Sequence, residues 1–343
     1  MSFLFPTNIE SRLYEHRGSN ATVFYFPITG MIITQPLKIG KCDYIPLSLF
    51  KEQIKLPQNM VENISVIAKT TVDVPENWIK NAIDNYSIAL QLTKQSIGAI
   101  YLSIYNSKKR CDNNRRIVIS PIGKHEVDEG LVIYQTNLST RNTTDVSSTL
   151  FFSDKDASDL FLANLDTINN QILMYYSNNN EYGNKILKSL EIIYCINNEI
   201  YSNERILKIC AALSMLFKAD NDTKDVDSPW IASRLNQLFH YRSVNIIEKI
   251  PETVNCLKKT KKNYNEIFID IYSRIRNSFM HGIIDPYQEF TVITTDEYLL
   301  YIVSLYELID ILILDGSFNS LQTTKELVER IKQIELSHKS KTL

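Results

Sequence analysis

One stretch decides how the second half of the chain folds. Residues 266–282 have the sequence EIFIDIYSRIRNSFMHG, in which the apolar side chains keep the spacing of one face of an α-helix. These side chains are Ile267, Phe268, Ile271, Tyr272, Ile275 and Phe279. Gly282 is a common kind of helix stop. We therefore predict an amphipathic helix over residues 263–281, with its apolar face in a core.

Two polar side chains of this predicted helix lie off its apolar face. Arg276 and His281 are five residues apart, which is about 140° on an ideal helix, so both can lean over the same helix end. A second copy of the helix, related by a two-fold axis, would bring two such pairs into one cleft. The alternative is that His281 only caps carbonyl groups at the helix end and that Arg276 is a surface ion-pair residue.

The remainder of the second half is mainly helical. An apolar stripe that begins after Ser153 and extends to Ile172 indicates a first helix. Pro251 is expected to break or kink a helix predicted over residues 243–260. The other helices are predicted over residues 183–198, 203–218, 228–241, 295–314 and 321–336.

The first 150 residues have a different texture, in which short β-rich runs alternate with turns. A hairpin is predicted from residues 22–26 and 31–34, and one helix from residues 76–92. Further strands are predicted over residues 64–67, 70–74, 99–104, 116–119 and 131–134. Residues 137–148 are rich in Ser, Thr and Asn, as linkers are. We therefore predict an α+β protein, with a β-rich domain over residues 1–150 and an all-helical bundle over residues 151–343.

Composition excludes several classes of function. The chain has 343 residues and a formal net charge of -2, so any nucleic acid must be bound by a local patch and not by a global positive field. Five scattered cysteines without C-x-x-C spacing, and five dispersed histidines, argue against a zinc site or a disulfide framework. We expect no metal, no cofactor and a reducing cytoplasm.

No segment of the sequence predicts membrane insertion or export. No apolar run reaches the roughly 18–20 residues of a membrane span, and the beginning of the chain lacks the features of a signal peptide.

The first domain also lacks a Gly-rich phosphate loop, a nucleophile elbow and a metal pair. We expect this domain to be a sensor, a substrate-guiding module or a dimerisation element.

The motif helix resembles one found in a known family. Arg276-Asn277-x-x-x-His281, at the end of an apolar helix and followed by Gly282, resembles the Arg-x-x-x-x-His signature of the HEPN superfamily. Residues 206–217, ILKICAALSMLF, resemble the earlier core helix of this fold. Residues 267–282 are similar to the motif helix of ApeA-like HEPN domains. The resemblance covers roughly residues 155–335.

The resemblance implies a metal-independent endoribonuclease with Arg276, His281 and Asn277 in its catalytic site. The imidazole, with an unperturbed pKa of about 6.5, would help to remove the proton of a ribose 2′-hydroxyl. The guanidinium would stabilise the phosphate in the transition state, and Asn277 would orient the phosphate or His281. The implied products are a 2′,3′-cyclic phosphate and a 5′-hydroxyl.

The resemblance also implies a biological setting. It predicts a homodimer with a composite active site, and a bacterial anti-phage or toxin effector that causes abortive infection. This effector would be restrained until a phage trigger activates it, or held inactive by an antitoxin. One position departs from a subgroup of HEPN toxins. Those toxins carry Tyr two residues after the His, where a nucleotidyltransferase partner modifies them, whereas this chain has Ile283.

A basic run precedes the motif helix. We predict that its four lysines attract the RNA backbone: Lys258, Lys259, Lys261 and Lys262. Tyr272 is a further RNA-binding candidate. Tyr241 and Arg242 are a weaker candidate for stacking on a base, because their helix is first of all a core helix. Each of these segments has a plainer alternative, such as a solvated loop between helices.

Two other functions remain open from the sequence. The first is a non-catalytic HEPN module that binds RNA or a nucleotide through the same residues. The second is a helical interaction protein in which the motif only caps a helix.

Overall fold

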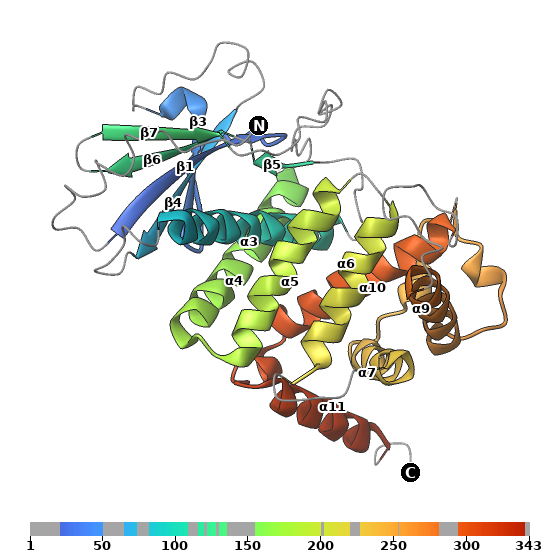
Figure 1. Ribbon diagram of the computed structural model, residues 1–343. Helices are drawn as coiled ribbons and strands as arrows, with labels where there is room; N and C mark the ends of the chain where they lie inside the picture. Colours follow the sequence, from blue (N-terminus) through green and yellow to red (C-terminus); the bar gives the residue numbers. More distant parts are fainter. Residues whose placement is uncertain are drawn as a thin grey trace. The chain divides into compact units, whose positions relative to one another are not determined.

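The structure is a computed structural model of the chain (Figure 1). It describes residues 21–50, 65–73, 82–108, 116–119, 122–127, 130–135, 155–199, 202–219, 227–252, 254–280 and 294–339. The chain forms two compact units. The first unit comprises residues 1–97 and 113–154, and the second comprises residues 98–112 and 155–343.

The first unit contains an antiparallel sheet. Its strands follow the order β2-β3-β4-β1-β6-β7, and β5 also pairs with β1. Their bounds are β1 (Ala21–Thr29), β2 (Leu37–Ile39), β3 (Cys42–Pro46), β4 (Val66–Asp73), β5 (Val118–Ile119), β6 (Ile122–Val127) and β7 (Gly130–Gln135). The central strand β1 is covered on both of its faces, because successive side chains of a strand point to opposite sides. Phe24 and Phe26 lie 6.4 and 5.9 Å from the ring of Tyr86 in helix α3 (Ala82–Lys108), whereas Tyr25 meets Phe50.

Two strand predictions are wrong. Residues 99–104 belong to α3, which continues sixteen residues past the predicted end of its helix at residue 92 and ends at Lys108. Every residue from 99 to 104 is buried, and a fully buried helix segment has the same unbroken apolar pattern as a buried strand. Residues 31–34 form no strand, so the predicted hairpin does not exist and β1 pairs with β4, β5 and β6 instead.

Other strand predictions agree with the structure in part. The runs at 64–67 and 70–74 contribute to one strand, β4, and the run at 131–134 lies within β7. The run at 116–119 contains β5, which is only two residues long. The hairpin of β2 and β3 was not predicted, because Gly40 and Lys41 form a turn between runs too short to show alternation.

The second unit is helical. Its helices are α4 (Lys155–Asn178), α5 (Glu181–Asn198), α6 (Ser202–Phe217), α7 (Ser228–Tyr241), α8 (Ile246–Lys249), α9 (Tyr264–Met280), α10 (Thr295–Leu314) and α11 (Thr324–Lys339), with 3-10 turns η3 (Leu257–Lys259) and η4 (Gly316–Phe318). Most predicted helices agree with these bounds within a few residues. The predicted helix over 243–260 is broken as expected near Pro251, because α8 ends two residues before that proline. The α+β class is thereby confirmed.

Helix α10 is the centre of the helical unit. Sixteen of its twenty residues are buried, and it contacts α4, α5, α6, α7 and α8 (Figure 1). A helix that is apolar on all sides must be surrounded by other elements. Its first turn is fixed by a capping box between Thr294 and Glu297. The position of α10 therefore sets the position of the helices that surround it.

Helices α3 and α5 are in close contact at Gly98. A Cβ atom on Gly98 would lie 2.0 Å from the carbonyl oxygen of Leu190 in α5. That oxygen belongs to the backbone of a helix and cannot move aside alone. A side chain at this position would therefore force the two helices apart.

We predict that Gly98→Ala destabilises the helical unit by about 1–3 kcal/mol, the usual cost of overpacking. The helix propensity of alanine offsets roughly 1 kcal/mol of the steric cost, which is too little to cancel a 2.0 Å contact. The measurement is thermal unfolding followed by circular dichroism at helical wavelengths. Gly316→Ala is the matched control, because nothing lies within 4 Å of a Cβ at Gly316. Equal melting temperatures for the two variants would contradict the predicted contact.

Candidate functional site

Helix α9 begins with a reciprocal cap. The backbone N–H of Glu266 donates to the side chain of Asn263 at 3.0 Å, and the N–H of Asn263 donates to the Glu266 carboxylate at 2.8 Å. The face that carries Ile267, Phe268, Ile271 and Ile275 is buried, as the sequence predicted. This cap and this face fix where α9 starts and which side of it meets the core.

Three contacts align α9 antiparallel to α10. The hydroxyl of Tyr264 lies 2.9 Å from that of Ser304 at one end. In the middle, the ring of Tyr301 is stacked on Phe268 at 4.7 Å. At the other end Arg274 forms an ion pair with Glu297. The last turn of α9 therefore lies near the first turn of α10.

Two of the predicted catalytic residues lie at this end of α9. Arg276 and Asn277 belong to its last turn, and the helix ends at Met280. The side chains of Arg276 and Asn277, and the whole of His281, lie outside what the structure describes. By helical register Arg276 lies off the buried face, in the turn that follows Tyr272. Asn277 lies on the other flank, in the turn that follows Arg274.

Arg274 has a structural role that separates it from Arg276. Its guanidinium pairs with Glu297 of α10 and, at 3.4 Å, with Asp270 one turn earlier. Partial burial lowers the pKa of Arg274, but Glu297 and Asp270 outweigh this effect and leave the pKa above its ordinary value. Arg274 is thus a permanent cation that joins α9 to α10.

A row of alternating charges follows one flank of α9. Lys262 lies 3.6 Å from Asp270, which also pairs with Arg274, and Arg274 pairs with Glu297. The row leads from the lysine-rich loop, residues 258–262, toward the end of the helix. Asn277 comes next on this flank by register. Each exposed pair contributes little alone, but a network limits which orientations the side chains adopt.

The lysine-rich loop, residues 258–262, is anchored by Asp296. The buried Asp296 carboxylate accepts the N–H groups of Cys256 at 2.9 Å and Leu257 at 3.1 Å. This anchor was not predicted, although Thr294 and Glu297 around it match the capping-box pattern visible in the sequence. It fixes the backbone directly before the four lysines.

The four lysines of this loop differ in their partners. Lys258 pairs with Glu252 at 3.2 Å and Lys262 with Asp270 at 3.6 Å. Lys259 and Lys261 are exposed, and nothing in the described part of the chain pairs with them. The charge available to an outside anion is therefore concentrated at Lys259 and Lys261.

Tyr272 lies between α9 and α6. Its hydroxyl is 3.3 Å from that of Ser214, and its ring is stacked on Phe268 at 6.1 Å. The side chain is half-buried. These contacts give Tyr272 a structural role in packing, and its part in RNA binding stays a prediction.

Comparisons of this chain with protein-family models, curated proteins and solved structures find no match. Within the described ranges, no three His, Cys, Asp or Glu side chains are grouped as ligands of a metal ion. Over the same ranges, no helix is long and apolar enough to cross a membrane.

We predict that Asp296→Ala releases the lysine-rich loop. Two N–H groups lose their acceptor, and each such bond contributes on the order of 1 kcal/mol. Local opening should therefore increase at least about tenfold. The measurement is limited digestion with trypsin, which cuts after lysine, with the cleavage sites identified by mass spectrometry. Glu329→Ala, which removes an exposed carboxylate of α11, is the control. Unchanged cleavage within residues 258–262 would show that Asp296 does not hold the loop.

Proposed function

We propose that the helical unit is a HEPN-type, metal-independent endoribonuclease. One observation carries the proposal. An amphipathic helix, α9, packs into a helical bundle and carries Arg276 and Asn277 near its carboxyl end. The helix ends at Met280, the residue before His281. The nearby Arg274 is already engaged by Glu297 and Asp270. Arg276, which is five residues before His281, has the spacing of the family's motif.

The roles of these residues follow from their chemistry. His281 takes the proton of the ribose 2′-hydroxyl, which then attacks the adjacent phosphate. Arg276 stabilises the negative charge on the phosphate oxygens during the attack. The P–O bond to the next 5′-oxygen breaks, and this oxygen takes up a proton from water or from the protonated His281. The products are a 2′,3′-cyclic phosphate and a 5′-hydroxyl. Asn277 positions the phosphate or the imidazole.

The lysine-rich loop fits the same proposal as an entry for RNA. Lys259 and Lys261 follow the backbone that Asp296 holds, and they are available to RNA phosphates. The charged row on α9 leads from this loop to the helix end. The lysines alone also fit a module that binds RNA without cutting it, which is the second candidate function.

The wider setting is part of the same proposal. Two copies of the chain would pair their α9 ends in one composite cleft. The protein would act in the cytoplasm as an anti-phage or toxin effector that is restrained until a phage trigger activates it, or that is held inactive by an antitoxin. The N-terminal sheet unit would be the sensor, the substrate guide or a dimerisation element.

We predict that the wild-type protein cuts RNA in excess EDTA, and that Arg276→Ala and His281→Ala each reduce the rate at least about 100-fold. Loss of a general base or of a charge-stabilising group costs about this much. The measurement is cleavage of a labelled RNA, with detection of 2′,3′-cyclic phosphate ends. Arg330→Ala, on the surface of α11, is the control and should cut at the wild-type rate. Wild-type cutting by His281→Ala would end the enzymatic proposal, whereas RNA binding without cutting by the wild type would favour the second candidate.

We predict that the paired substitution of Lys259 and Lys261 by Ala weakens RNA binding more than the same substitution of Lys258 and Lys262. Both double variants lose the same charge, so long-range attraction changes equally and only local phosphate contacts differ. The slope of log affinity against log salt should fall by about 0.7 per lost contact to single-stranded RNA. The measurement is fluorescence anisotropy over a salt series in the His281→Ala background. Equal slopes for the two double variants would contradict this assignment.

A further inference from the structure

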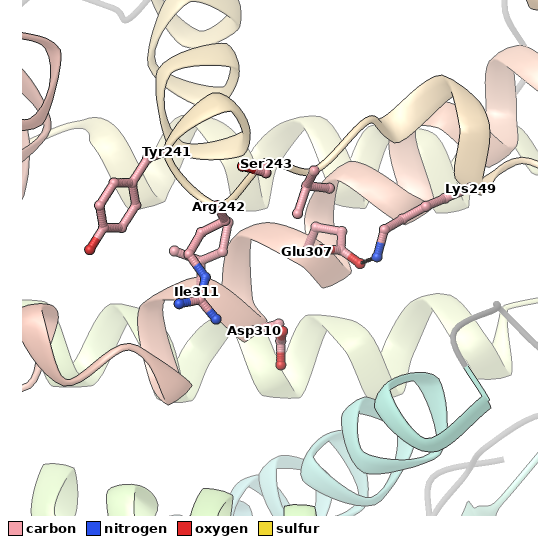
Figure 2. A pocket seen from close by; sticks show the side chains of 8 residues that line it. Tyr241, Arg242, Ser243, Lys249, Glu307, Asp310 and Ile311 are labelled. Carbon is pink, nitrogen blue, oxygen red and sulfur yellow. Dashed lines mark hydrogen bonds and ion pairs between the residues drawn. The ribbon is translucent and has the colours of Figure 1, made fainter. Parts of the chain in front are cut away.

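A pocket of about 400 Å³ lies between the carboxyl end of α7, helix α8 and the second half of α10. Its lining includes Arg242, Ser243, Lys249, Glu307, Asp310 and Ile311 (Figure 2). Sites for small molecules have volumes of about 300–1,000 Å³. The pocket is therefore large enough for one small organic ligand but not for a folded nucleic acid.

Most charged groups of this pocket have strong partners within the protein. The buried Glu307 accepts a hydrogen bond from the hydroxyl of Tyr105 at 2.5 Å and pairs with Lys249. The Lys249 ammonium also lies 5.7 Å from the centre of the Tyr105 ring. Asp310 accepts a hydrogen bond from the Asn106 amide. These contacts fix the pocket wall, since they join α3, α8 and α10.

Arg242 is the charged group of this pocket that lacks a strong partner within the described residues. Its side chain is 46 % exposed and has one ion-pair contact, with Asp315 at 3.5 Å. Its guanidinium forms no hydrogen bond within the described residues, and Figure 2 shows its side chain among those that line the pocket. The Asp315 oxygen that it faces is buried and also lacks a hydrogen bond. A guanidinium has five N–H donors in a plane, so this wall of the pocket can still bind an anion.

The turn after α7 occupies three of the carbonyl groups at the helix end with hydrogen bonds. The N–H groups of Arg242, Ser243 and Val244 donate to the carbonyls of Leu238, His240 and Phe239, at 3.1, 3.0 and 2.7 Å. The turn requires Ser243 to adopt a φ of 54°, a left-handed conformation that serine rarely adopts and glycine adopts freely. The exposed Ser243 hydroxyl also lines the pocket, beside Arg242.

From this arrangement we infer that the pocket is a binding site for a nucleoside phosphate, either a free mononucleotide or the terminal nucleotide of an RNA. Arg242 and Ser243 donate to the phosphate oxygens. Ile311 and Val244 offer apolar surface to the base. Glu307 accepts a hydrogen bond from a ribose hydroxyl, because Tyr105 and Lys249 both contact the same carboxylate oxygen, Oε1, and a carboxylate has about four acceptor positions.

The pocket is separate from the proposed ribonuclease site. Glu297 marks the end of α9 through its pair with Arg274, and Glu307 lines the pocket. Ten residues of helix separate them, which is about 15 Å. The inference therefore does not rest on the proposed function, and the two can fail independently.

The test is isothermal titration of the full chain with adenosine, guanosine, cytidine and uridine monophosphates, with inorganic phosphate as the comparison. Arg242→Ala should weaken nucleotide binding at least about tenfold, because it removes the charge-assisted hydrogen bonds to phosphate. Ser243→Gly keeps the left-handed turn and removes the hydroxyl, so it should weaken binding without lowering the melting temperature. Arg330→Ala is the control for loss of a surface arginine and should bind as the wild type does.

Competition then identifies the source of the nucleotide. Displacement of the bound mononucleotide by a short RNA with a terminal phosphate supports an RNA end, and displacement by mononucleotides alone supports a free nucleotide. Binding of nucleotides no tighter than inorganic phosphate, or wild-type binding by Arg242→Ala, would overturn the inference. RNA cleavage measured on the same samples reports on the proposed ribonuclease separately.

Discussion

The stacking of Tyr301 on Phe268 is the contact on which the arrangement of the helical unit's site depends. The two rings lie 4.7 Å apart, and the Tyr301 hydroxyl donates to the backbone carbonyl of Phe268 at 2.9 Å. Burial raises the pKa of Tyr301 well above its ordinary value, so the hydroxyl stays protonated and keeps this hydrogen bond. One side chain thus fixes both the distance and the register between α9 and α10.

That register has consequences at both ends of α10. At its first turn, Glu297 forms an ion pair with Arg274. Asp296 accepts two backbone hydrogen bonds directly before the lysine-rich loop. Toward its far end, Glu307 and Asp310 hold α3 and α8 and line the pocket beside Arg242. Carboxylates on an otherwise apolar helix are costly to bury unless they are paired. Their partners are the groups that position the two proposed sites.

Pairing also determines which cations remain available for a ligand. Carboxylates of the same unit form ion pairs with four cations, Lys249, Lys258, Lys262 and Arg274. Lys259 and Lys261 have no such partner in the described structure, and Arg242 has only a long one. For a chain with a net charge of -2, local availability of positive charge is more informative than its total.

The sequence alone determined the helical character of the second half, the buried face of α9 and the break before Pro251, because these depend on local periodicity and on the chemistry of single residues. It placed Arg276 near a helix end, but whether it meets a phosphate beside His281 and Asn277 is still a prediction. Only the tertiary structure decided that residues 99–104 are helical. It also decided that Arg274 forms an ion pair with Glu297, and that Arg242 and Lys249 line a pocket together with Glu307. The physical reason is that ion pairs and buried contacts join residues that are far apart in the chain. The local sequence pattern does not show which residues will be partners.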